Sequence, residues 1–471
     1  MRSPILHVAL SFVLGALPAF AGDLLVDQSA GAPAFATIQA AVNAASVGDR
    51  ILIAPGLYPE RVTITKGIEL VGAGPSLTQV RPTQVNGGFI NPAQPPITIQ
   101  NLPAGQRLRI SGMRCSSQHN GGVLPALPML SALECQGRIE LSDLVLDHSS
   151  YGWGAAPNQT GTLLVFNCAQ VIADRVSTIN SLQGNPTTGY QGRNGIAGAW
   201  VGNSRAWFNA CQLRGKPGFE ILPLIPTIPS GDGGAGVFVL NSEVELARTS
   251  AEGGIARYFA DFGQPPAASG AGLQAVGSQV RLIGGSSSLL QGASAQPPGS
   301  GSQPGSISTA AVGVSLDAGS SLVRASDAAV LGGAGAGAQP AAPAFQLAPG
   351  SQQIDLARRL PSLALIPGTV PIGQPLTIDY QGEPGSVHLR ALWVSSGLAL
   401  PLPGIGGSLL LDPLTLVQAL PVVLDGAGQA QVASGIPNNP NYLGLTLVEQ
   451  SAQVAGFDID LSAPAILNVR F

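Results

Sequence analysis

The sequence predicts an all-β protein: a right-handed parallel β-helix with an N-terminal capping helix, followed by a C-terminal β-sandwich. Three observations lead to this prediction. A short phrase with alternating apolar residues recurs along the first three-quarters of the chain. The 471 residues include 62 Gly and 39 Pro but only 10% charged residues, a composition typical of many tight turns and few exposed helices. After about residue 360, short strands separated by Gly-, Pro- and Asn-rich turns replace the recurring phrase.

The N-terminus predicts export. Met1-Arg2 is followed by an almost wholly apolar run over residues 5–19, and Ala19-Phe20-Ala21 has the small-x-small pattern of a cleavage site. We therefore interpret residues 1–21 as a secretory signal peptide and expect a secreted or cell-surface protein. The alternative is a retained membrane anchor, which is disfavoured because the run is shorter than the about 20 residues that span a bilayer. The mature chain should contain no membrane span.

A short helix is predicted directly after the leader. Residues 35–45 carry apolar side chains at helical spacing and are rich in Ala. A solenoid exposes its core at each end and must cover it. Because strands begin just after this segment, we expect the helix to cover the first coil.

The recurring phrase consists of a small residue followed by alternating apolar positions. Its later copies centre on Cys135, Cys168, Ser204, Ser242, Ser278 and Ser320. Successive copies are 33 (135 to 168) to 42 (278 to 320) residues apart, which leaves room for short strands but no long helix. This period is typical of a solenoid whose coils hydrogen-bond to one another. A β-propeller has a similar period, about 40–45 residues, but it usually needs Asn-Gly hairpin turns, which are scarce here.

The first segments of the repeat resemble the opening of pectin-lyase-like right-handed β-helix proteins, which pectinesterases and pectate-lyase-type proteins share. The segments that carry the resemblance are residues 35–42, 48–51, 55–60 and 68–74. The resemblance implies a β-helix domain over residues 22–358. It is specific for the fold and not for an activity, because this opening is the capping and first-coil region in that family.

Two cysteines occupy the same column of neighbouring repeat units. Stacked residues in adjacent coils lie about 4.8 Å apart, which is close to the Cα spacing of a disulfide. We therefore predict that Cys135 and Cys168 are stacked neighbours and that they form a disulfide, which export permits. The alternative is that both are simply small buried residues in a ladder. Cys115 and Cys211 fall outside this column and have no predicted partner.

Residues 361–471 form the second predicted domain. Alternating runs such as 376–380, 387–393 and 444–448 are separated by turn-rich segments. About seven short strands over this length favour a β-sandwich of the kind attached to exported bacterial proteins. The sequence assigns no activity to this domain.

Acidic residues give a weak indication of catalysis. The Asp-Phe phrase that holds a catalytic Asp in pectinesterases is absent, and residues 258–263 are only a partial match. The best group contains Asp143, Asp147 and His148 on one coil and Asp174, Arg175 and Asn180 on the next. Of these, Asp143, Asp147, Asp174 and Arg175 are the candidate catalytic residues. Paired carboxylates can perform acid–base hydrolysis, but polar residues at coil corners also satisfy turn amides. We predict no cofactor, although Ca²⁺, which takes about 6–8 oxygen ligands, is the ion that such a group would hold.

Aromatic residues of the middle coils indicate a second kind of site. Flat rings on a long β-helix face suit stacking against sugars. The candidate carbohydrate-binding residues are Tyr151, Trp153, Tyr190 and Trp200. Trp207 lies in an alternating strand and could equally belong to the core.

Two functional hypotheses follow from these patterns. The first is an exported, non-catalytic β-helix protein that binds, or forms part of, an extracellular polysaccharide or cell surface. The second is a polysaccharide-active enzyme, a lyase, esterase or hydrolase with a degenerate site. A net charge of −4 disfavours nucleic acid and anionic membranes as partners.

Overall fold

The computed structural model describes most of the chain after residue 21. The described residues are 22–29, 33–82, 95–116, 127–148, 158, 160–180, 194–218, 231–256, 267–285, 287–295, 308–336, 340–393, 396–401, 405–411, 416–436, 438–439, 445–456 and 458–470. The predicted signal peptide lies outside them. Among the described residues, no helix is long and apolar enough to cross a membrane.

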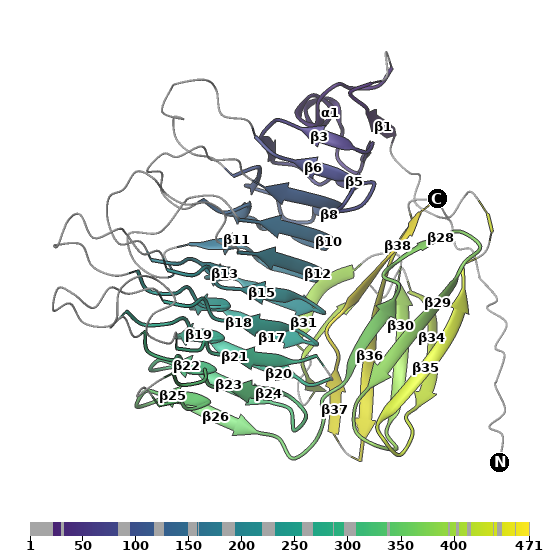
Figure 1. Ribbon diagram of the computed structural model, residues 1–471. Helices are drawn as coiled ribbons and strands as arrows, with labels where there is room; N and C mark the ends of the chain where they lie inside the picture. The colour runs from purple at the N-terminus through teal and green to yellow at the C-terminus, as the bar shows by residue number, and fades with distance from the viewer. Residues whose placement is uncertain are drawn as a thin grey trace, which may run out of the picture.

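The first part of the chain is a parallel β-solenoid. One sheet of nine strands contains a single strand from each successive coil, and all its pairings are parallel. Its strands are β4 (Val62–Ile64), β7 (Ile97–Gln100), β9 (Leu130–Leu133), β11 (Gly161–Phe166), β13 (Ala197–Gly202), β16 (Val237–Leu240), β19 (Leu273–Val276), β22 (Val314–Leu316) and β25 (Phe345–Leu347). This confirms the predicted all-β, parallel solenoid (Figure 1).

A second solenoid sheet contains seventeen strands, again parallel to their partners. They are β1 (Asp23–Val26), β2 (Arg50–Ile53), β3 (Gly56–Tyr58), β5 (Glu69–Gly72), β6 (Thr78–Val80), β8 (Arg107–Ser116), β10 (Arg138–Asp147), β12 (Gln170–Ile179), β14 (Arg205–Asn209), β15 (Gln212–Arg214), β17 (Glu243–Ala247), β18 (Ser250–Glu252), β20 (Gln279–Ile283), β21 (Leu289–Gln291), β23 (Ser321–Arg324), β24 (Ala329–Leu331) and β26 (Gln352–Asp355). Between the two sheets, buried aliphatic side chains form one continuous core.

Each middle coil turns at two residues in the left-handed backbone region. The first turn follows the strand of the nine-stranded sheet and falls on Asn101, Glu134, Asn167, Asn203, Asn241 and Gly277. The second divides the coil's segment of the seventeen-stranded sheet into two halves and falls on Gly112, Asp143, Arg175, Ala210, Arg248 and Gly285. Asn adopts positive φ more readily than most residues, which explains why Asn precedes the small residue in several copies of the repeat.

The small residues of the repeat form a hydrogen-bonded ladder. The backbone N–H of Cys168 donates to Ser204 Oγ at 2.9 Å, and that of Ser204 donates to Ser242 Oγ at 3.0 Å. The ladder continues from Ser242 to Ser278 at 3.1 Å and from Ser278 to Ser320 at 3.2 Å. The hydroxyls thus satisfy buried amides that the turn leaves without a strand partner. The predicted register of the repeat is confirmed.

Cys135 and Cys168 begin this ladder and are stacked as predicted. The N–H of Ala169, which follows Cys168, donates to the carbonyl oxygen of Cys135 at 2.8 Å, and each thiol donates to the carbonyl oxygen two residues before it, at 3.2 Å for Cys135 and 3.4 Å for Cys168. Both cysteines are buried free thiols in the structure, as are Cys115 and Cys211. The stack therefore exists without the bond, and the disulfide stays a prediction.

The expected helix is present in a shortened form. Helix α1 (Ile38–Ala44) starts after Thr37, whose side chain accepts a hydrogen bond from Ala40 N, as favoured at an N-cap. The carboxylate of Glu60 accepts hydrogen bonds from the first two amides of the helix, from Ile38 N at 2.7 Å and from Gln39 N at 2.8 Å. The helix buries its apolar face against β1, β2 and β4. It lies at the N-terminal end of the stack (Figure 1).

The C-terminal part contains two main sheets over a common apolar core. The three-stranded sheet consists of β27 (Ser362–Ile366), β29 (Pro375–Gln381) and β35 (Gln429–Gly435). The larger sheet contains β28 (Thr369–Pro371), β30 (Val387–Trp393), β32 (Ile405–Gly406), β34 (Leu416–Val423), β36 (Thr446–Ala455), β37 (Asp458–Leu461) and β38 (Ala465–Arg470). Strands β31 (Ser396–Pro401) and β33 (Ser408–Leu411) pair separately. Two sheets around one core are the layering that the sandwich prediction expects.

These C-terminal strands lie along the side of the solenoid (Figure 1). They pack on the outer face of the seventeen-stranded sheet, in the half that precedes the second left-handed turn. Two apolar patches join the parts. Ile172 and Trp207 of the solenoid contact Leu410 and Ile466, and a second patch contains Ala247, Ile283, Ala325, Leu360 and Ala463. Trp207, only 4% exposed, is therefore buried at the contact between the solenoid and the C-terminal strands.

Candidate functional site

Three of the four predicted catalytic residues meet at the contact between the solenoid and the C-terminal strands. Arg175 Nε donates to Asp143 Oδ1 at 2.7 Å, and another guanidinium nitrogen donates to the carbonyl oxygen of Ile466 at 2.8 Å. Asp174 is fully buried and pairs with Arg175. Its carboxylate also accepts from Asn209 Nδ2 at 2.8 Å and from the N–H of Ile466 at 3.0 Å. We call this group the interface cluster.

Burial and the Arg175 charge act in opposite directions on these carboxylates. Burial alone raises the pKa of Asp143, but hydrogen bonds from Arg175 and Thr369 outweigh it and hold that pKa below its usual range. Full burial raises the pKa of Asp174, which the Arg175 charge only partly offsets. Burial opposes the charge of Arg175 as well, yet the two carboxylates raise its pKa. The cluster is thus arranged as an internal ion pair that joins two parts of the protein.

The fourth predicted residue, Asp147, lies apart from the interface cluster. It follows the second left-handed turn of β10, is 6% exposed and pairs with Arg114 from the neighbouring strand β8. The structure therefore does not bring all four residues to one site. Within the described residues, no group of three or more His, Cys, Asp or Glu side chains is positioned to hold a metal ion.

A buried pair of nitrogen-bearing side chains, Lys216 and His148, lies near the same end of the coil. Lys216 Nζ is 2.9 Å from His148 Nδ1, and both side chains are almost fully buried. Burial lowers the pKa of Lys216 to about 7. An amine with such a pKa can exchange a proton near neutral pH. Sequence reasoning missed Lys216 because a single Lys in a turn-rich segment forms no recognisable pattern.

Of the four predicted carbohydrate-binding residues, Trp200 is the one within the described residues; Tyr151, Trp153 and Tyr190 lie outside them. Trp200 lies on β13 of the nine-stranded sheet, between two partly exposed rings. Its ring centroid is 5.9 Å from that of Phe166 on β11 and 5.9 Å from that of Phe238 on β16. We call Phe166, Trp200 and Phe238 the aromatic row.

The indole of Trp200 is held along its strand. Its Nε1 donates to the carbonyl oxygen of Asn158 at 2.9 Å. The far edge of the ring lies over Gly202, where an added Cβ would be only 2.4 Å from the ring carbons. Gly202 thus leaves the space in which the ring lies flat. Buried and partly exposed residues alternate in β11, β13 and β16. This alternation is the sequence pattern from which Phe166 and Phe238 could have been predicted to lie on the same outer face as Trp200.

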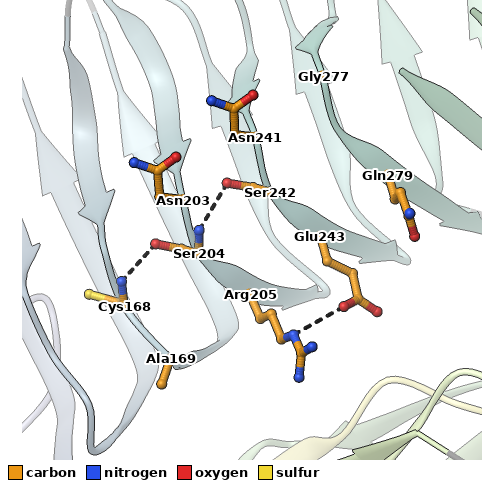
Figure 2. A pocket seen from close by; sticks show the side chains of 10 residues that line it. All are labelled: Cys168, Ala169, Asn203, Ser204, Arg205, Asn241, Ser242, Glu243, Gly277 and Gln279. Carbon is orange, nitrogen blue, oxygen red and sulfur yellow. Dashed lines mark hydrogen bonds and ion pairs between the residues drawn. The ribbon is translucent and has the colours of Figure 1, made fainter. Parts of the chain in front are cut away.

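An open groove runs along the first left-handed turn of successive coils (Figure 2). It has a volume of about 530 Å³ and is lined by Cys168, Ala169, Asn203, Ser204, Arg205, Asn241, Ser242, Glu243, Gly277 and Gln279. We call it the corner groove. Figure 2 shows the carboxamides of Asn203 and Asn241 on successive coils, with the half-exposed ion pair of Arg205 and Glu243 nearby, at 3.2 Å.

The corner groove and the aromatic row adjoin along the chain. Phe166 is followed directly by Asn167, and Gly202, which lies under the indole of Trp200, is followed directly by Asn203. Three apolar rings and a line of amide and charged groups therefore occupy adjacent sides of the same corner. Such a combination offers ring faces for stacking and fixed donors and acceptors for hydroxyl groups.

Comparison with known proteins gives no family. No family model matches the chain, and no curated protein matches it. Among solved structures, the enzymatically active domain of tailspike protein 2 of bacteriophage CBA120 is similar at 9% sequence identity and a TM-score of 0.30, with 90% of this chain and 71% of that chain covered. Neither the fold nor the function below rests on this likeness.

Proposed function

We propose that the chain is an exported, non-catalytic protein that binds an extracellular polysaccharide through the aromatic row and the corner groove. In this proposal the solenoid is a right-handed β-helix of the pectin-lyase-like type with α1 as its cap, and the C-terminal domain is a β-sandwich. The observation that carries the proposal is the partly exposed row of three rings beside a polar groove. Localisation at the cell surface or outside the cell follows from the predicted leader.

The chemistry of the two adjoining surfaces suits a sugar polymer. The apolar faces of pyranose rings stack on aromatic side chains, which bring a large apolar area to the contact. Carboxamides and ion-paired side chains can donate to and accept from neighbouring hydroxyls. The interface cluster supports a non-catalytic role because its carboxylates already bond to Arg175 and to the C-terminal strands.

The test is Trp200→Ala in a glycan-binding assay. Loss of a central Trp from a binding surface costs about 2 kcal/mol or more, so we expect affinity to fall about thirtyfold or more. The matched control is Leu389→Ala, which removes an exposed apolar side chain (49% exposed) from the C-terminal domain and should leave affinity unchanged. Equal affinity of both variants and the wild type would rule out the aromatic row as the binding surface. Absence of binding to every polysaccharide would rule out the function.

One observation favours a second candidate function, acid–base catalysis on a polysaccharide. Lys216 and His148 form a close buried pair, and burial brings the pKa of the amine to about 7. Purified protein can be screened for unsaturated products, reducing ends and methanol release. Turnover that Lys216→Met abolishes, with the folded state intact by circular dichroism, would establish this function and overturn the non-catalytic proposal.

A further inference from the structure

We infer that the bound polymer is a neutral, linear polysaccharide that lies along the solenoid axis, across the outer face of the nine-stranded sheet. This inference rests on the proposed function and adds the chemical class of the ligand and its path. It comes from the side chains of the whole sheet rather than from the aromatic row alone.

The nine-stranded sheet carries no charge along its length. None of its strands, from β4 to β25, contains Asp, Glu, Lys or Arg. In contrast, most strands of the seventeen-stranded sheet carry at least one such residue, for example Arg109 on β8, Glu140 on β10 and Arg281 on β20. The same solenoid thus has one charged sheet and one uncharged sheet. Solvent exposure alone does not explain this difference, because side chains of the uncharged sheet are also partly exposed.

The outward side chains of the uncharged sheet form a row in register, and all of them except Ser131, which is 1% exposed, are at least partly exposed. From the N-terminal end the row is Thr63, Thr98, Ser131, Leu164, Trp200, Phe238, Gln274, Ser315 and Gln346. Hydroxyl and amide groups lie toward both ends, and apolar side chains occupy the centre. Neighbouring strands are about 4.8 Å apart, which is close to the length of one unit in an extended pyranose chain. A linear chain along the axis would therefore meet about one strand per sugar.

A polyanion does not fit this surface. Uronate or sulfate groups are bound by Arg and Lys, through charge-assisted hydrogen bonds, and the row contains neither residue. The nearest cation of the corner groove, Arg205, is already paired with Glu243. The net charge of −4 would also repel a polyanion at long range. Rings, hydroxyls and amides are the groups that recognise an uncharged sugar.

The first experiment compares neutral and acidic polymers. Wild-type protein is tested by affinity electrophoresis and calorimetry against a soluble β-glucan, a galactomannan, polygalacturonate and alginate, at low and at high salt. We expect binding to a neutral polymer that is insensitive to salt and at least about thirtyfold weaker in Trp200→Ala. Trp200-dependent binding to the acidic polymers alone would overturn the inference and keep the proposed function. If the protein binds none of these four polymers and no other polysaccharide, both the inference and the proposed function would be overturned.

The second experiment tests the path along the axis. Ser315→Arg places a long cation on the row two strands beyond Phe238, while Ser321→Arg makes the same change in the same coil on the seventeen-stranded sheet. We expect Ser315→Arg to weaken binding of long chains several-fold and to spare short oligosaccharides that cover only the aromatic row. Ser321→Arg should leave both unchanged. Equal loss for short and long chains, or no loss, would overturn the axial path.

Sedimentation of the wild type and of Trp200→Ala tests the other occupant that an uncharged sheet could accept, a second copy of this chain. Self-association that depends on Trp200 would overturn the inference and assign the surface to a dimer contact. A wild-type monomer at all concentrations tested would support a ligand other than the protein itself.

Discussion

Replacing Arg175 by Gln tests whether the interface cluster is a structural or a catalytic feature. The guanidinium of Arg175 donates to Asp143, to Asp174 and to the carbonyl oxygen of Ile466, which belongs to the C-terminal strands. Gln is too short and too weak a donor to replace these bonds. Arg175→Gln would leave two carboxylates close together at a largely buried site with no cation between them.

The magnitude follows from the burial of the pair. Removing one partner of a buried ion pair costs about 3–5 kcal/mol, mainly because a buried charge is left unpaired. The side chains of Arg175 and Asp143 keep 20% and 18% exposure, so we expect the lower end, about 3 kcal/mol. Arg175→Lys keeps the charge but loses the planar fork of donors, and should cost about 1–2 kcal/mol.

The loss should depend on pH in a defined direction. In the wild type the pKa of Asp143 is lowered in the folded state, so its contribution is present above the unfolded value of about 3.9 and is lost as the pH falls through the folded value. In Arg175→Gln both carboxylates lose their cation, and protonation then removes the free-energy cost of burying two unpaired negative charges. The difference between the wild type and the variant should be largest at neutral pH. It should shrink as the pH falls, starting above about pH 4, because the uncompensated buried carboxylates of the variant protonate before free carboxylates do.

The assay is urea unfolding followed by tryptophan fluorescence, since Trp207 lies in the apolar patch between the two parts. The matched control is Arg214→Gln, which breaks the ion pair with Glu252 at an exposed site and should cost less than about 1 kcal/mol. An unchanged unfolding midpoint for Arg175→Gln would refute the structural role. Loss of a polysaccharide-degrading activity at full stability would assign the cluster to catalysis instead.

Three further predictions concern single side chains. Ser242→Ala should cost about 1–3 kcal/mol, because it leaves the buried N–H of Ser204 without its acceptor, whereas Ser321→Ala should change urea stability by less than about 0.5 kcal/mol; equal effects would contradict the ladder. Burial lowers the pKa of His388 to about 4, so the wild type should lose about 3 kcal/mol relative to His388→Gln as the pH falls from about 6.5 to 4, and parallel pH profiles would disprove this. Exchange with an external disulfide should oxidise Cys135 and Cys168 together and release two external thiols. Titration should then find two protein thiols, whereas four remaining protein thiols would contradict the predicted disulfide.

The solenoid could be predicted from the sequence because single residues at fixed positions of each coil determine its register. The left-handed turn favours Asn, and the amide that follows it needs the hydroxyl of the next coil, so Asn-Ser pairs such as 203–204 and 241–242 recur. These requirements are local and repeat with every coil. They therefore specify both the turn position and the stacking before any long-range contact is considered.

The candidate site was only partly predictable, for a physical reason. Asp174 and Arg175 look like exposed polar residues at a coil corner, and their true partner, the backbone of Ile466, is about 290 residues away in the chain. A single sequence contains no signal for such a contact. Trp200 was predicted from its residue type, whereas Phe166 and Phe238 acquire meaning only when the register places them on both sides of it.

The position of the C-terminal domain decides which face of the solenoid is free for a ligand. A polymer that approached the covered half of the seventeen-stranded sheet would have to displace the contacts of Arg175 and Asp174 with Ile466 and of Arg281 with Asp460. Those contacts include buried charges, which become costly when their partners leave. Among the described residues, the C-terminal apolar clusters include no side chain of the nine-stranded sheet, and the outward row of this sheet is uncharged. Because one face is occupied from within the chain, the polysaccharide of the proposed function would have to bind at the other face.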